Sequence, residues 1–207
     1  MRRPIPILGI AGSIGAGKST VAGLLARMGC VAIDSDVQAR AAWSDPQIRP
    51  LLIQAFEQFA PETVGAVASF DRKAIAKAMF AHAELRRAVE AIIHPWVARQ
   101  REATMSLHAA DPNIRAFVWD TPLLFETGLN DQCDAIVVVD APRDIRLERV
   151  ESSRGWDDAE LARREASQMD IALKRARADL LVDGSQSLDA IRASLSTWLD
   201  RVAPIAI

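Results

Sequence analysis

The stretch from Gly12 to Ser19 constrains this chain most strongly, because it spells G-x-x-x-x-G-K-S. A loop with this spelling holds nucleotide phosphates: its backbone N–H groups point at the phosphate oxygens, and its glycines permit the close approach. Lys18 is expected to reach the β- and γ-phosphates, and Ser19 to place its hydroxyl on Mg²⁺. The residues expected to bind the nucleotide are Gly12, Ser13, Ile14, Gly15, Ala16, Gly17, Lys18, Ser19 and Thr20.

The segments on either side of this loop favour the same interpretation. Residues 5–11 form a short apolar run, as expected of a buried parallel strand. Behind the loop, Val21, Leu24 and Met28 recur at helical spacing, and Gly29 stands where a helix C-terminal cap belongs. A strand–loop–helix order puts the loop at a helix amino terminus, which attracts anions. The alternative is a glycine-rich turn that binds nothing, and the flanks argue against it.

Four further apolar runs, with helical patterns between them, predict an α/β chain with a five-stranded parallel sheet covered on both faces. Ligands of such sheets bind beyond the carboxyl ends of the strands, which draws attention to the aspartates that follow the runs. The runs are residues 31–33, 116–119, 135–139 and 180–182, and the aspartates are Asp34, Asp120, Asp140 and Asp183.

Composition excludes several other functions. The formal net charge of -2 argues against binding nucleic acid through bulk charge, and no apolar run approaches the length of a membrane span. The two cysteines, Cys30 and Cys133, fit a reducing cytoplasm and form no metal motif. We therefore expect a cytoplasmic protein with a small-molecule substrate, no nucleic-acid or membrane partner, and a monomeric or weakly homo-oligomeric state.

Residues 37–115, between the second and third apolar runs, are too many for a simple connection. Apolar residues at i, i+3, i+4 spacing within 48–59 and 85–96 predict helices. This region is our candidate acceptor-binding lobe. His94-Pro95 interrupts the second stripe, so a break or kink is expected there. Whether His94 contacts a ligand or is structural stays open.

Several carboxylates are candidates for chemistry. Asp34 and Asp36 follow the second apolar run, beside the expected position of the loop, where a kinase needs a carboxylate to orient an alcohol and accept its proton. Either aspartate could instead cap the helix that follows. Asp120 is expected to hold Mg²⁺ directly or through water, with a turn cap or a support for Ser19 as the alternative.

Segment 141–178 is rich in arginine, with acidic residues interspersed. A solvated helix face with i,i+4 pairs explains most of these charges. Phosphoryl transfer, however, spreads negative charge over the moving group, and a guanidinium on a mobile lid can stabilise it. We expect one or two of these arginines to do so, and the residues alone leave open which.

Taken in order, the motifs resemble those of the dephospho-coenzyme A kinase family over nearly the whole chain. The D-x-D, H-P and P-L-L-F-E motifs are far more specific than the phosphate loop, which many nucleotide hydrolases share. The matching segments are residues 12–20, 33–36, Asp71-Arg72, 93–95, 122–126, 138–140, Gln168, 178–179 and Asp183.

This resemblance implies a three-layer P-loop kinase fold that transfers the γ-phosphate of ATP, with Mg²⁺, to the ribose 3′-hydroxyl of dephospho-coenzyme A. It implies a single domain over 1–207, with a nucleotide core at 1–36, 116–140 and 179–207, a helical acceptor lobe at 37–115 and a lid at 141–178. By position, Asp36 is the base with Asp34 beside it, while Lys18 and Arg149 act on the phosphates. The residues implied along the acceptor cleft are Arg72, His94, Leu123, Leu124 and Glu126, and those implied for the metal are Ser19 and Asp120.

Two departures from the family pattern lie in the lid, where Ser167 precedes Gln168 in place of an arginine and Arg146 stands near a common glutamine. Arg163 or Arg164 could compensate, or the lid register could differ.

Two other functions share the loop. A GTP-dependent switch protein would carry an [NT]-K-x-D motif, and residues 138–142 have no such lysine. A kinase for another alcohol is disfavoured by the D-x-D, H-P and P-L-L-F-E set.

Overall fold

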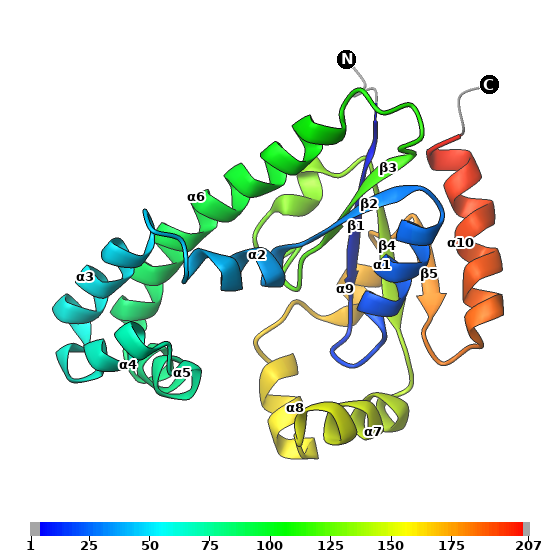
Figure 1. Cartoon of the computed structure of the whole chain (residues 1–207). Helices are drawn as coiled ribbons and strands as arrows, with labels where there is room; N and C mark the ends of the chain where they lie inside the picture. Colours follow the sequence, from blue (N-terminus) through cyan, green and yellow to red (C-terminus); the bar gives the residue numbers. More distant parts are fainter. Residues whose placement is uncertain (1–4, 205–207) are drawn as a thin grey trace. The chain divides into compact units, whose positions relative to one another are not determined.

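The structure, a computed structural model, describes residues 5–204. The chain forms two compact units (Figure 1). The first takes the residues up to Asp34 and those from Met105 onward, and the second is Ser35–Thr104. Each unit has its own apolar core.

The first unit is built on a five-stranded sheet in which every pairing is parallel and the strand order is β2-β3-β1-β4-β5. This confirms the predicted α/β class and the five apolar runs as strands. Parallel pairing needs a crossover between strands, and helices supply it. The strands are β1 (Ile7–Gly12), β2 (Cys30–Asp34), β3 (Ala116–Asp120), β4 (Ala135–Asp140) and β5 (Leu180–Asp183).

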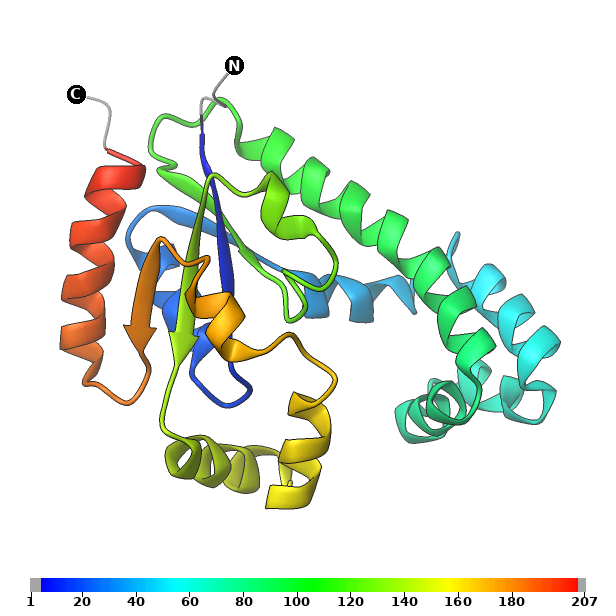
Figure 2. The ribbon, with the colours of Figure 1, turned by 180° about the vertical axis from the view of Figure 1, so that it is seen from behind.

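Alternation along β1 divides the core of this unit into two layers, one on each face of the sheet. Leu8 and Ile10 pack in a cluster with α1 (Lys18–Arg27) and α10 (Leu188–Val202). On the other face, Ala11 packs in a cluster with residues of the segment after β3 and of α9 (Ile171–Arg175) (Figures 1 and 2). The sheet is therefore the middle of three layers, and its strand ends carry the phosphate loop.

The arginine-rich segment forms α7 (Arg143–Arg154), α8 (Asp158–Glu165) and α9. Val150 and Leu161, from α7 and α8, pack on Ile14 of the phosphate loop, and all three side chains are buried. An apolar contact thus fastens this segment to the loop, and most of its charged residues are exposed, with Arg146 and Lys174 as buried exceptions.

The second unit is helical, as predicted. Its core includes Leu52, Phe56, Leu85 and Val89, which lie on the two apolar stripes. Asp71 caps α5 by accepting hydrogen bonds from the N–H groups of Lys73 and Ala74. The helices are α2 (Ser35–Ala42), α3 (Arg49–Phe59), η1 (Pro61–Thr63), α4 (Val64–Ser69), α5 (Arg72–Ala81) and α6 (Ala83–His108), of which the last four residues belong to the first unit.

Of the break or kink expected at His94-Pro95, the break is absent, since α6 continues through Pro95. A proline inside a helix removes the hydrogen bond to the carbonyl four residues earlier. That residue is Ala91, which is exposed, so water can satisfy its carbonyl. The buried residues Val89, Ile93 and Val97 hold the helix on either side of the proline.

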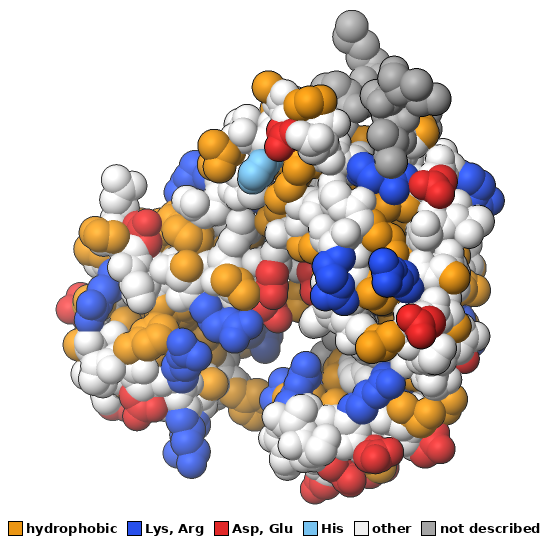
Figure 3. Space-filling view, turned by 45° about the vertical axis from the view of Figure 1, so that its right-hand side comes forward, with side chains coloured by type: hydrophobic (Ala, Val, Ile, Leu, Met, Phe, Trp, Pro, Cys, Tyr) orange, Lys and Arg blue, Asp and Glu red, His pale blue; other side chains and the backbone are white. Residues whose placement is uncertain are grey.

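On the face that Figure 3 shows, lysines and arginines are interspersed with aspartates and glutamates. Such mixing agrees with the small net charge. Cys30 is buried, and burial raises the pKa of its thiol to about 11. The thiol is therefore protonated and serves as a small core residue.

Candidate active site

The phosphate loop has the backbone that its glycines permit. Gly12, Gly15 and Gly17 have φ of 143°, 77° and 103°, which side chains larger than hydrogen rarely allow. At Gly12 there is also no room for a side chain, because a Cβ would lie 1.9 Å from the carbonyl oxygen of Val139. The loop therefore lies tightly against the end of β4, and α1 begins directly after Gly17.

Lys18 is folded onto this loop. Its Nζ donates hydrogen bonds to the carbonyl oxygens of Gly12 (3.2 Å) and Ser13 (2.8 Å). Burial lowers the pKa of Lys18 to about 8, the charges of Lys174, Arg154 and Arg146 also lower it, and Asp120 opposes them. Several cations thus converge on the loop, an arrangement that suits a ligand with several negative charges.

The aspartates at the ends of β2 and β3 lie at the same edge of the sheet. Asp34 and Asp120 are register partners at the ends of β2 and β3, and Asp120 is also the register partner of Ile10 on β1. The structure therefore places both carboxylates at the carboxyl edge of the sheet. Asp36 lies in the first turn of α2, at the start of the second unit, and is exposed.

Arg149 lies against the loop backbone. Its guanidinium donates to the carbonyl oxygens of Gly15 (3.3 Å), Ala16 (3.2 Å) and Gly184 (2.8 Å). These bonds connect α7, the phosphate loop and the turn after β5. Arg149 therefore braces the loop in this structure, in addition to any contact with phosphate.

Gly184 is a residue of the site that the sequence analysis did not identify. A Cβ at this position would lie 1.9 Å from the carbonyl oxygen of Ala16. Its N–H donates to the carbonyl oxygen of Asp140 (2.7 Å), which holds the turn against the end of β4. Only the absence of a side chain lets the turn after β5 touch the phosphate loop.

We expect Gly184→Ala to raise the KM for ATP by tenfold or more and to lower the free energy of unfolding by about 2 kcal/mol, since the methyl group must displace loop backbone. Gly65→Ala is the matched control, because a Cβ at Gly65 has nothing within 4 Å. Steady-state kinetics and chemical denaturation measure both effects. Equal KM values for ATP in the two variants would contradict the close approach.

The lid base contains a buried ion pair that the sequence did not identify. Arg146 is 9% exposed and pairs with Glu165, while its guanidinium donates to the carbonyl oxygens of Ile14 (3.2 Å) and Ala141 (2.9 Å). Arg143 also pairs with Glu165 (2.7 Å). Arg146 thus supports the phosphate loop from α7.

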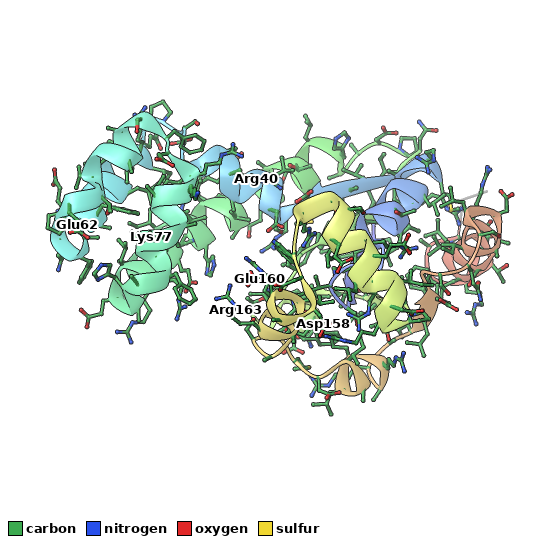
Figure 4. The ribbon with its side chains drawn as sticks, turned by 90° about the horizontal axis from the view of Figure 1, so that it is seen from below. Arg40, Glu62, Lys77, Asp158, Glu160 and Arg163 are labelled. Carbon is green, nitrogen blue, oxygen red and sulfur yellow. The ribbon has the colours of Figure 1, made fainter. Side chains whose placement is uncertain are left out.

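Arg163 and Arg164 are the two residues that could compensate for the arginine missing before Gln168, and both are paired with a carboxylate. Arg163 pairs with Glu160 on α8 (Figure 4). Arg164 pairs with the same carboxylate. Arg164 also lies 4.0 Å from the centre of the Trp156 ring, and Arg154 lies 4.7 Å from it. Among these residues, Arg154 is the one whose charge acts on Lys18.

The residues implied for the acceptor come from both units. Leu123 is 40% exposed, whereas Leu124 is 1% exposed and packs in the core, although the sequence placed it among the acceptor contacts. Arg72 begins α5 and stacks on Phe70, with its guanidinium carbon 5.0 Å from the ring centre. His94 is exposed on α6.

Glu126 pairs with Lys174, with 2.9 Å between Oε1 and Nζ, and also accepts a hydrogen bond from the N–H of Met169 (2.7 Å). Burial acts to raise the pKa of Glu126, but the hydrogen bonds from Lys174 and Met169 outweigh it and hold the pKa below its ordinary value. Glu126 is therefore an ionised partner of the lid segment.

Comparison with known proteins decides which family this geometry belongs to. The family model of dephospho-CoA kinase matches residues 6–190. A dephospho-CoA kinase of Anaeromyxobacter dehalogenans is 41% identical over 186 residues, which are 89% of this chain and 86% of the relative. The chain belongs to the dephospho-CoA kinase family. Membership makes it an ATP-dependent kinase.

Solved structures share the fold of this chain. The protein TT1252 from Thermus thermophilus superposes with a TM-score of 0.80 at 32% identity, covering 97% of this chain and 98% of its own. The dephospho-CoA kinase from Campylobacter jejuni has a TM-score of 0.54 at 19% identity, covering 96% and 97%, and so shares the fold.

Proposed function

We propose that this chain transfers the γ-phosphate of ATP to the ribose 3′-hydroxyl of dephospho-coenzyme A, the last step of coenzyme A synthesis. The observation that carries the proposal is the family match over most of the chain, together with an intact phosphate loop that holds Lys18. In this reaction the bond between the β,γ-bridging oxygen and the γ-phosphorus breaks, and a bond from the acceptor oxygen to that phosphorus forms. The acceptor hydroxyl loses its proton, and ADP leaves.

The donor half of the site is assigned to the first unit. Backbone N–H groups of residues 12–20 would surround the phosphates at the start of α1. Lys18 would leave the carbonyl oxygens of Gly12 and Ser13 and bind the β- and γ-phosphates. Arg149 is our proposal for the guanidinium near the transferred group, since it already lies on the loop, and Arg154 is the second candidate because its charge reaches Lys18.

Ser19 and Asp120 fit a magnesium ion. Asp120 lies at the edge of the sheet and acts electrostatically on Lys18, and Ser19 is the next residue along α1. One carboxylate and one hydroxyl, completed by phosphate oxygens and water, are the usual protein contribution to Mg²⁺ in a kinase. Bound there, the ion would neutralise charge on the phosphates.

For the acceptor half, we propose Asp36 as the base that orients the ribose hydroxyl and accepts its proton, with Asp34 beside it. Both residues are exposed and therefore accessible to a substrate hydroxyl. Arg72, His94, Leu123 and Glu126 stay proposed acceptor contacts.

The lowered pKa of Lys18 predicts how nucleotide affinity depends on pH. Lys18 loses its proton near pH 8 in the empty protein, whereas bound phosphates would raise its pKa, so binding takes up a proton above pH 8. The affinity for ATP should therefore fall about tenfold between pH 7.5 and 9.5. Calorimetric titration at each pH measures this affinity. Lys18→Met is the control: its side chain has no proton to lose, so its affinity for ATP should not change with pH. A flat profile in the unsubstituted protein would contradict the assignment.

The test of the function is ADP formation with a panel of acceptors: dephospho-coenzyme A, adenosine, AMP, shikimate and gluconate. Turnover with dephospho-coenzyme A at least a hundredfold faster than with any other acceptor is expected. Comparable turnover with shikimate or gluconate would instead favour a different small-molecule kinase.

Cytoplasmic location, a monomeric or weakly homo-oligomeric state and the absence of nucleic-acid or membrane partners stay predictions. They suit a donor and an acceptor that are both water-soluble. Within residues 5–204, no helix is long and apolar enough to cross a bilayer.

A further inference from the structure

Lys174 is the most deeply buried charged residue in the part of the chain that the structure describes, with 2% of its surface exposed. Its Nζ lies 2.9 Å from Oε1 of Glu126 and 3.5 Å from Oε1 of Gln168. An ammonium group has three N–H donors, so these two described acceptors leave one donor over. A buried charge with a single carboxylate partner is costly, which makes its position worth explaining.

The position is beside the phosphate loop. Lys174 lines a cavity of about 220 Å³ together with Gly12, Ser13 and Ile14, the first three residues of that loop. The other charged residues lining it are Arg146 and Glu165, which pair with each other, and Asp170, which caps α9. Lys174 also acts electrostatically on Lys18. The cavity therefore has phosphate-binding backbone on one side and a buried ammonium on the other.

We propose that Lys174 is a further catalytic cation of this kinase, which binds an oxygen of the γ-phosphoryl group through the donor that Glu126 and Gln168 leave over. Glu126 is then a positioning residue: it holds Lys174 over the cavity while the N–H of Met169 holds Glu126. This inference rests on the donor half of the proposed function and deepens it.

The charges favour this role over simple fastening of α9 to the core. An apolar side chain would fasten a helix without the cost of burying a charged ammonium group. Lys174 and Lys18, in contrast, repel each other in the empty site, and an anion that enters between them relieves this repulsion. During transfer the equatorial oxygens of the phosphoryl group carry spread negative charge, and a preorganised buried cation stabilises such charge strongly.

The test compares two nucleotides that differ in the γ-phosphate, with no acceptor present. We expect Lys174→Met to weaken the Mg²⁺ complex of the β,γ-imido analogue of ATP at least tenfold in calorimetric titration, and to leave the Kd of ADP within twofold. Arg177→Met is the control. It also removes one positive charge, three residues further along the chain, but the Arg177 side chain does not line the cavity, so neither Kd should change.

Lys174→Gln, which keeps a donor for Glu126, is the second variant in case the methionine impairs folding, and it should show the same selective loss. Glu126→Gln should show a smaller selective loss, because Lys174 loses its anchor but keeps its charge. Equal weakening of both nucleotides, or a lowered Tm with the ratio of the two Kd values unchanged, would overturn the proposal in favour of a structural pair. Because no acceptor is used, this outcome is independent of whether dephospho-coenzyme A is the substrate.

Discussion

Replacing Lys18 by Met should lower the rate of phosphoryl transfer by about a thousandfold while the protein stays folded. The Lys18 ammonium is expected to stabilise the negative charge that develops on the β- and γ-phosphates during transfer. Removing one such preorganised donor lowers the rate by about 10²–10³. Its present partners are two carbonyl oxygens at the edge of the loop, so the methionine removes little that holds the fold. Single-turnover kinetics and circular dichroism are the measurements.

Lys77→Met makes the same chemical change on an exposed position of α5 and serves as the control. Retention of more than a tenth of the normal rate in Lys18→Met would refute the role of the loop. Loss of the folded signal in that variant would show instead that Lys18 acts on the structure.

Replacing Asp36 by Asn should reduce kcat by about 10²–10⁴-fold and leave the KM for the acceptor within a factor of a few. A general base contributes about this much, and asparagine keeps the shape and most hydrogen bonds while it cannot accept the proton.

Asp34→Asn is the matched variant for Asp36, two residues earlier at the end of β2. If the larger loss of kcat occurs in Asp34→Asn, the base is Asp34 and the assignment is reversed. If only the KM for the acceptor rises in Asp36→Asn, Asp36 binds the substrate and another group takes the proton.

The features that the sequence predicts well are encoded by neighbouring residues. The spacing of Gly12, Gly17 and Lys18 demands one backbone shape, and the apolar runs of β1, β3 and β4 are buried in the sheet. The same local logic identified Asp34 and Asp120, because parallel strands end on the same edge of a sheet.

The features it missed depend on residues far apart in the chain. Gly184 has its role only because the turn after β5 meets the carbonyl oxygen of Ala16, and nothing beside Gly184 indicates this contact. Lys174 lies in an arginine-rich segment whose pattern predicts a solvated helix face, yet it is buried and pairs with Glu126, which lies far away in the sequence. At Pro95 the helix does not end, although proline disfavours a helix, because buried residues of α6 pack in the core on both sides of it.

The most direct test of the central claim is the position of the new phosphate. Dephospho-coenzyme A should be incubated with the protein, Mg²⁺ and ATP labelled in the γ-position, and the product examined by phosphorus NMR and mass spectrometry. The account predicts one labelled phosphate on the 3′-oxygen of the ribose and one ADP for each product molecule. A phosphate on any other oxygen, or ADP with free inorganic phosphate and unchanged acceptor, would contradict it.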